Sequence, residues 1–154
     1  MKVHAGVDAG SGYVHTVTGT AANVHDVNET EHLIREDDTV VYGDSGYLNA
    51  GKHMDSMEAE RLSAMEFRIN VRPSSVKMTK GYRGIRRDEN IENRKSSTRC
   101  KVEHPFLIVK RQFGYCKTVY KGLAKNMNRF NVLFAGANLL MCIRAGRSEA
   151  LCMG

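Results

Sequence analysis

Small, apolar and β-branched residues in the first part of the chain follow the pattern of two short β-strands. Small and apolar residues alternate over residues 3–7, and residues 13–20 are rich in Val, Thr and Tyr. The sequence Asp8-Ala9-Gly10-Ser11-Gly12 between them has the composition of a tight turn. These features predict a β-hairpin.

A second set of elements is expected between residues 26 and 71. Asp26 or Asn28 could cap a short helix that runs to about residue 34 or 35. A β-branched run at 39–42 ends just before Asp44, residues 54–65 have a helical pattern, and 67–71 form another strand pattern. A buried strand that presents an Asp at its carboxyl end is typical of catalytic α/β folds.

The last third of the chain has helical periodicity. One helix is expected from Ser97 to about Gln112, with Pro105 inside it and Gly114 beyond its end. Residues 74–98 are polar, basic and poorly periodic, so an exposed connection is predicted there. A final helix is predicted over about 123–145. Its apolar stripe, expected to pack on the sheet, consists of Leu123, Met127, Phe130, Phe134, Ala137, Leu140 and Met141.

Charge is distributed unevenly along the 154 residues, although the net charge is only +6. Residues 1–67 hold 4 Lys or Arg against 12 Asp or Glu, residues 68–111 hold 13 against 4, and residues 112–154 hold 6 against 1. An acidic part joined to a basic part suits a protein that brings carboxylates to a polyanion, although a solvated basic surface would have the same charges.

Several classes of protein are disfavoured by the sequence. The longest apolar stretch, residues 132–143, is too short to span a bilayer, and the N-terminus has no signal-peptide core. The four cysteines have no Cys-x-x-Cys spacing and the six histidines are scattered, so free thiols and no structural zinc are expected. A cytoplasmic protein without membrane association is therefore predicted.

One predicted helix face carries candidate chemistry. Arg99, Glu103 and Lys110 share this face with Phe106, at spacings of four, three and four residues. Two-metal phosphodiester cleavage requires carboxylates on rigid elements with cations nearby, and Asp44 and Glu103 have suitable types and positions. The spacing alone also fits an ion-paired surface helix.

Longer sequence blocks resemble a known family. Residues 95–115, Lys-Ser-Ser-Thr-Arg-Cys-Lys-Val-Glu-His-Pro-Phe-Leu-Ile-Val-Lys-Arg-Gln-Phe-Gly-Tyr, resemble the third catalytic block of insertion-sequence DDE transposases with a Tyr-Arg-Glu-Lys signature, families four and five. Residues 40–47 resemble the second block and residues 6–17 the hairpin block, and residues 24–27 and 138–140 also match. The resemblance covers nearly the whole chain.

The resemblance implies a bacterial mobile-element enzyme with an RNase H-like fold, a mixed sheet flanked by helices. Such enzymes use three acids to bind Mg²⁺ at a two-metal site, cut transposon ends and join them to target DNA. Asp44 then corresponds to the second acid and Glu103 to the third, both as metal ligands, while Arg99 and Lys110 bind DNA phosphates. Double-stranded DNA is the expected partner, together with a second copy of the chain or a full-length transposase.

This sequence departs from the family pattern at two positions. The Tyr of the signature is replaced by Ser96, and no residue matches the first catalytic Asp, which in the family precedes the hairpin. Asp8 is expected to form the hairpin turn, and His104, about 100° from Glu103 around the helix, is not expected to act as a base. Residues 1–154 are therefore expected to be one N-terminally truncated catalytic domain that lacks the first strand.

Two other functions remain open from the sequence. An incomplete triad suits an inactive remnant or a DNA-binding inhibitor of intact transposase. Separately, Gly6-Val-Asp-Ala-Gly-Ser-Gly12 is similar to the first phosphate loop of actin-like and sugar-kinase ATPases, although one such motif is weak evidence.

Overall fold

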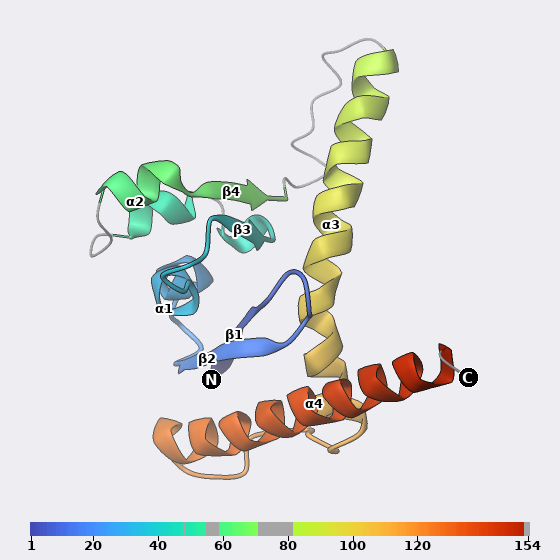
Figure 1. The fold of residues 1–154 in the computed structure, drawn as a ribbon. Helices are drawn as coiled ribbons and strands as arrows, with labels where there is room; N and C mark the ends of the chain where they lie inside the picture. Colours follow the sequence, from blue (N-terminus) through green and yellow to red (C-terminus); the bar gives the residue numbers. More distant parts are fainter. Residues whose placement is uncertain (48, 55–58, 71–81, 153–154) are drawn as a thin grey trace. The chain divides into compact units, whose positions relative to one another are not determined.

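The chain is a mixed α/β protein whose parts form two compact units (Figure 1). The computed structural model describes residues 1–47, 49–54, 59–70 and 82–152, with only the backbone described at 52–53, 82–92 and 147–152. The hairpin unit consists of Met1–Asn23 with Lys101–Gly154, and the parallel-strand unit consists of Val24–Cys100. Within the described ranges the strands form two separate pairs rather than the single mixed sheet that was expected.

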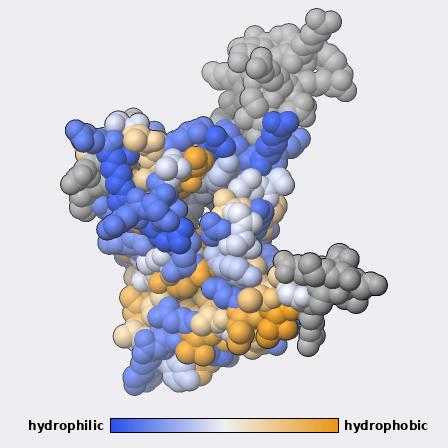
Figure 2. Space-filling view, in the orientation of Figure 1, coloured by the Kyte–Doolittle hydropathy of each residue, from blue (hydrophilic) through white to orange (hydrophobic). Residues whose placement is uncertain are grey.

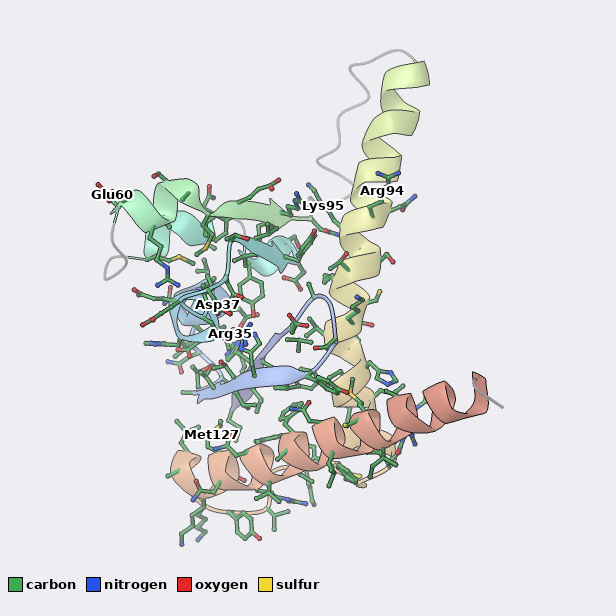
Figure 3. The ribbon with its side chains drawn as sticks, in the orientation of Figure 1. Arg35, Asp37, Glu60, Arg94, Lys95 and Met127 are labelled. Atoms are coloured by element: carbon green, nitrogen blue, oxygen red, sulfur yellow. The ribbon has the colours of Figure 1, made fainter. Side chains whose placement is uncertain are left out.

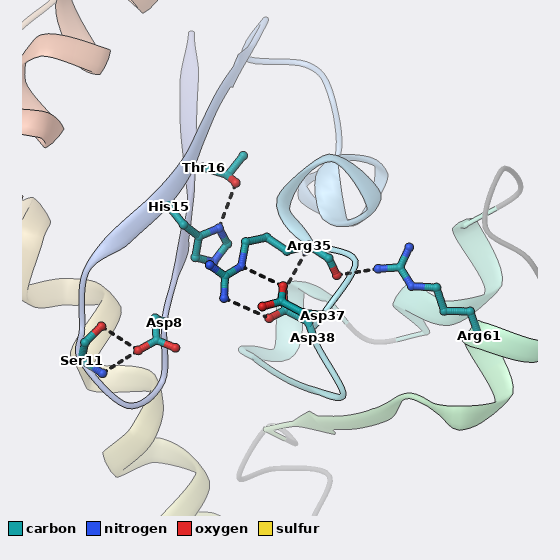
Figure 4. A network of polar contacts seen from close by, with 8 residues as sticks. All are labelled: Asp8, Ser11, His15, Thr16, Arg35, Asp37, Asp38 and Arg61. Atoms are coloured by element: carbon teal, nitrogen blue, oxygen red, sulfur yellow. Dashed lines mark hydrogen bonds and ion pairs between the residues drawn. The ribbon is translucent and has the colours of Figure 1, made fainter.

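The predicted hairpin is confirmed. Strands β1 (Lys2–Val7) and β2 (Val14–Thr20) pair antiparallel, with an irregularity between Gly6 and Val7. The Asp8 carboxylate accepts hydrogen bonds from the Ser11 amide and hydroxyl, both at 2.6 Å (Figure 4). Gly12 has a φ of 79°, a conformation that glycine adopts without strain. Asp8 is thus a turn-forming residue, as its position in the sequence predicted.

Helix α4 (Leu123–Cys152) packs against this hairpin and supplies three of the six buried core residues described in the hairpin unit. Phe130, Phe134 and Ala137 from the predicted stripe are buried, whereas Leu123 at its start is 45% exposed. Phe106 meets Phe134 edge to face, with ring centroids 5.0 Å apart. The apolar spacing therefore predicted the buried face correctly, apart from its first residue.

A side chain of α4 also extends the hydrogen bonding of β2. The Asn138 amide nitrogen donates to the Val14 carbonyl at 2.7 Å, and the Val14 amide donates to the Asn138 side-chain oxygen at 2.9 Å. Figure 3 labels Met127 on the same helix, whose sulfur occupies the position that a Cβ on Gly19 would take. Close packing of α4 on β2 therefore depends on a glycine in the strand.

In the parallel-strand unit, two short strands run side by side. Strands β3 (Val40–Gly43) and β4 (Glu66–Ile69) pair in parallel, with Gly43 opposite Ile69. Two short elements precede β3, η1 (Asp26–Glu29) and α1 (Thr30–Leu33). Between β3 and β4 lie η2 (Ser45–Tyr47), η3 (Ala50–His53) and α2 (Ala59–Ala64).

Polar contacts hold the loop that leads into β3. Arg35 forms ion pairs with Asp37 and Asp38 at 3.3 and 3.8 Å, and its carbonyl accepts a hydrogen bond from Arg61 of α2 (Figure 4). On the strands, Arg68 binds the Tyr42 hydroxyl at 2.6 Å. Lys95, labelled in Figure 3, donates to the Ile69 carbonyl at 3.3 Å at the end of β4.

Three sequence predictions need correction. Helix α3 spans Tyr82–Arg111 and so begins fifteen residues before Ser97; residues 82–98, expected in a connection, are helical, and 74–81 lie outside the described part. Its Arg, Glu and Lys residues favour a helix without an apolar stripe. The helix expected over 54–65 is shorter than predicted: α2 spans Ala59–Ala64, Met54 and Met65 are not helical, and 55–58 lie outside the described residues.

The predicted cap of the first helix is also wrong. The N-cap positions of η1 and α1 are His25 and Glu29, and neither side chain makes a capping hydrogen bond. Asp26 and Asn28 lie inside η1 instead. None of the helices, over the residues described, is apolar and long enough to cross a membrane. The thiols of Cys100, Cys116 and Cys142 are free and exposed, as predicted for them.

Candidate active site

Asp44 lies at the carboxyl end of the parallel strands. It directly follows β3, and the backbone pairing continues one residue beyond β4, where the Asn70 amide donates to the Gly43 carbonyl at 3.0 Å. A Cβ on Gly43 would lie 2.8 Å from Ile69 Cδ1 and 3.1 Å from Tyr47 Cβ, so a larger residue there would force these side chains to shift. Parallel pairing thus brings Asp44 and Asn70 to the same edge of the sheet.

The turn after β3 fixes the Asp44 side chain while leaving it exposed. Its Oδ1 atom accepts a hydrogen bond from the Gly46 amide at 2.8 Å, and its carbonyl accepts one from the Tyr47 amide at 3.1 Å. An Asp side chain that binds the backbone two residues later is a common turn device. The carboxylate is therefore held in place on a short turn at the surface.

A second carboxylate approaches the same turn. From the position that a Cβ on Gly46 would take, Asp44 Oδ1 lies 3.0 Å away and Asp26 Oδ2 lies 3.8 Å away. Sequence reasoning considered Asp26 only as a helix cap and missed this approach. The available signal was its position in the Val24-His25-Asp26-Val27 block, which matched the transposase pattern.

The pKa of the Tyr47 hydroxyl is raised by burial and by these acids. Burial raises its pKa to about 12, and the negative charges of Asp26, Asp44 and Glu29 act in the same direction. Both effects disfavour the charged phenolate. The carboxylates of η1 and the turn after β3 therefore create a locally negative environment in the parallel-strand unit.

One polar atom near this edge lacks a partner. The Asn70 side-chain oxygen is buried and accepts no hydrogen bond. Carboxylate and amide oxygens are the donors that Mg²⁺ and Ca²⁺ prefer, so this edge has suitable chemistry for a hard divalent cation. No group of three or more His, Cys, Asp and Glu side chains suited to a metal occurs in the described part of the chain.

Glu103 lies on α3, in the part of that helix that belongs to the hairpin unit. Pro105, Ile108 and Val109 of the same helix are buried in the core, whereas Glu103 and Lys110 are exposed. Arg99 is half-buried. Helical geometry confirms that the Arg99, Glu103 and Lys110 positions share one face, as predicted from the spacing.

The hairpin turn is fastened to the same helix. Lys101 donates hydrogen bonds to the carbonyls of Ala9 and Gly10. His104, beside Glu103, is exposed. Asp44 belongs to the parallel-strand unit and Glu103 to the hairpin unit, so each acid is supported by its own set of contacts.

Comparison with known families agrees with the sequence blocks. The model of the Transposase DDE domain family matches residues 1–139. No solved structure matches the chain. The match covers far more than half of the chain and agrees with the transposase resemblance rather than with the ATPase alternative. The chain therefore belongs to the DDE transposase family.

Proposed function

We propose that this chain acts as an insertion-sequence DDE transposase, which hydrolyses phosphodiester bonds at transposon ends and transfers the strands to target DNA. The observation that carries the proposal is the exposed Glu103 on a basic helix face, within a DDE family match over residues 1–139. We further propose that the two units together form one RNase H-like catalytic domain over residues 1–154.

Two carboxylates are proposed as ligands of the divalent cation. Asp44 is held by the turn after β3, and Glu103 extends from a helix whose opposite side is anchored in the core. Asp26 adds negative charge beside Asp44. When bound, Mg²⁺ would stabilise the charge that develops on the phosphate oxygens.

The basic members of the helix face are proposed to hold the DNA. Arg99 and Lys110 lie about one turn and two turns from Glu103 on α3, at a rise of ~1.5 Å per residue. A guanidinium can bind phosphate through two parallel hydrogen bonds, and an ammonium acts as a point charge. These two side chains would position the scissile phosphate beside Glu103.

The setting of this activity is the bacterial cytoplasm, with double-stranded transposon-end and target DNA as partners. Self-association, or association with a full-length transposase, is also part of the proposal. Orange areas in the lower part of Figure 2 mark apolar surface. Among the α4 side chains that the structure describes, four large apolar ones are exposed and support such association. They are Leu123, Val132, Leu139 and Ile143.

A strand-transfer assay with Mg²⁺ or Mn²⁺ tests the proposal. The substrate is a labelled duplex with the terminal sequence of the element that encodes the chain, and the expected products are nicked and joined strands. Binding without any cleavage would favour the second candidate, a DNA-binding inhibitor of intact transposase.

A further inference from the structure

A second set of basic residues lies in the loop before α4 and in the first turns of that helix. No Asp or Glu occurs between Glu103 and Glu149. Within this interval, four basic residues recur at every fourth position, and we call them the α4 basic row. The row consists of Lys117, Lys121, Lys125 and Arg129. The three lysines are exposed.

The loop that carries two of these lysines is held rigidly. Asn126 is only 5% exposed, and its side-chain nitrogen donates to the carbonyls of Tyr120 and Gly122, both at 2.7 Å. Its side-chain oxygen accepts from the Tyr120 amide at 3.4 Å. Lys121 lies between the two residues that Asn126 binds, so its backbone is fixed before any ligand arrives. Less conformational entropy is then lost on binding.

Arg129 is also positioned in advance. Its guanidinium lies 5.2 Å from the centre of the Tyr115 ring, which packs on Phe130 at 4.8 Å between ring centroids. Stacking on an aromatic ring orients a guanidinium and leaves its N–H groups able to bind phosphate. Tyr115, in the segment that follows α3, and Phe130 of α4 thus hold this cation against the core of the hairpin unit.

Open space surrounds the loop. Gly122 has a φ of 89°, and no atom lies within 4 Å of the position that a Cβ would take. Beside it is an open groove lined in part by Thr118, Leu123 and Asn126. The space beside Gly122 is therefore open to a large ligand that approaches the α4 basic row.

We propose that the α4 basic row is a second DNA-binding surface, which grips the phosphate backbone of duplex DNA. Duplex DNA fits because its phosphates form a dense line of negative charge, and the row has no acidic side chain within it. This inference rests on the proposed function, since it assigns additional DNA contacts to the same enzyme. Contacts to phosphate position a protein on DNA without reading its sequence.

The salt dependence of DNA binding tests this surface. The full chain is titrated with a labelled duplex over a series of KCl concentrations, and fluorescence anisotropy gives the affinity. Each phosphate contact contributes about 0.9 to the slope of log affinity against log salt. The double variant Lys121→Ala/Lys125→Ala should therefore have a slope that is less steep by about 1.8. The change should be the same on cognate and unrelated duplexes.

Arg144→Ala is the matched control. Arg144 is exposed on the same helix and binds Gln112 at 2.9 Å, nineteen residues beyond Lys125, or ~28 Å along the helix. This variant should keep the wild-type slope. Thermal melts of all variants report whether they fold.

The outcomes separate this inference from the proposed function. If the wild type binds duplex and the folded double variant keeps its slope, the basic row does not bind DNA. If the double variant loses affinity for polyglutamate and not for duplex, the row binds an acidic protein and this proposal is wrong. If the wild type binds no DNA at all, the proposed function fails as well.

Discussion

Individual carboxylates in this chain are placed by contacts that the linear sequence does not reveal. Asp44 is fixed by the Gly46 amide, and Asp26 approaches the same glycine from another element. Gly46 leaves room for both, because a Cβ there would lie 3.0 Å from Asp44 Oδ1. The local negative charge near Tyr47 follows from this arrangement.

The pKa of Tyr47 provides a direct test of these positions. Asp26→Asn and Asp44→Asn should each lower the pKa of Tyr47 from about 12, because each removes a negative charge that opposes phenolate formation. Ultraviolet difference titration measures tyrosinate, and Tyr47→Phe identifies the Tyr47 signal. Glu60→Gln, at an exposed position on α2, is the control. An unchanged Tyr47 pKa in both Asp variants would contradict the proximity of the acids.

Stability at high pH depends on the same group. The folded state keeps the Tyr47 proton up to about pH 12, whereas the unfolded chain loses it near the ordinary value of 10.0. The contribution of Tyr47 to the free energy of unfolding should therefore be constant below pH 10 and fall as pH rises from 10 to 12. Urea titrations across this pH range should show that the free energy of unfolding falls less in Tyr47→Phe than in the wild type. In the control Tyr120→Phe, at an exposed tyrosine, it should fall as much as in the wild type.

At the scale of elements, helix α4 and the hairpin depend on each other. Phe134 is 1% exposed and lies at the centre of the core of the hairpin unit. Phe134→Ala should lower the free energy of unfolding by about 3–5 kcal/mol, because it removes buried apolar contacts and leaves a cavity. Urea denaturation measures the change. Val132→Ala, two residues away and 72% exposed, should change it by less than about 0.5 kcal/mol.

Asn138 tests the polar part of the same contact. Asn138→Leu should cost about 1–3 kcal/mol, because the Val14 amide and carbonyl both lose their partner. The control is Asn131→Leu, at an exposed position on the same helix. Equal stability of the two variants would show that the Asn138 bonds contribute nothing.

The elements differ in how far the sequence could predict them. The hairpin and the buried face of α4 follow from local periodicity, and both are confirmed. The first half of α3 was missed because its polar residues form a helix without an apolar stripe. Asp26 was assigned to a cap because its approach to Gly46 depends on tertiary contacts. The catalytic roles of Asp44 and Glu103 stay predictions.

At the scale of the whole molecule, charge and chemistry are divided along the chain. Residues 1–67 are acidic and residues 68–154 are basic. The candidate metal ligands come from both compact units, Asp44 from one and Glu103 from the other.

The proposed role of Glu103 as a ligand of the catalytic cation is tested by strand cleavage with Glu103→Gln and with the wild type. Glutamine keeps the size of the side chain and removes the negative charge proposed to hold the cation. We expect the wild-type chain to cut its cognate transposon ends with Mg²⁺, Glu60→Gln to do the same, and Glu103→Gln to bind the same DNA without cutting it. If Glu103→Gln cuts at the wild-type rate, Glu103 is not a ligand of the catalytic cation.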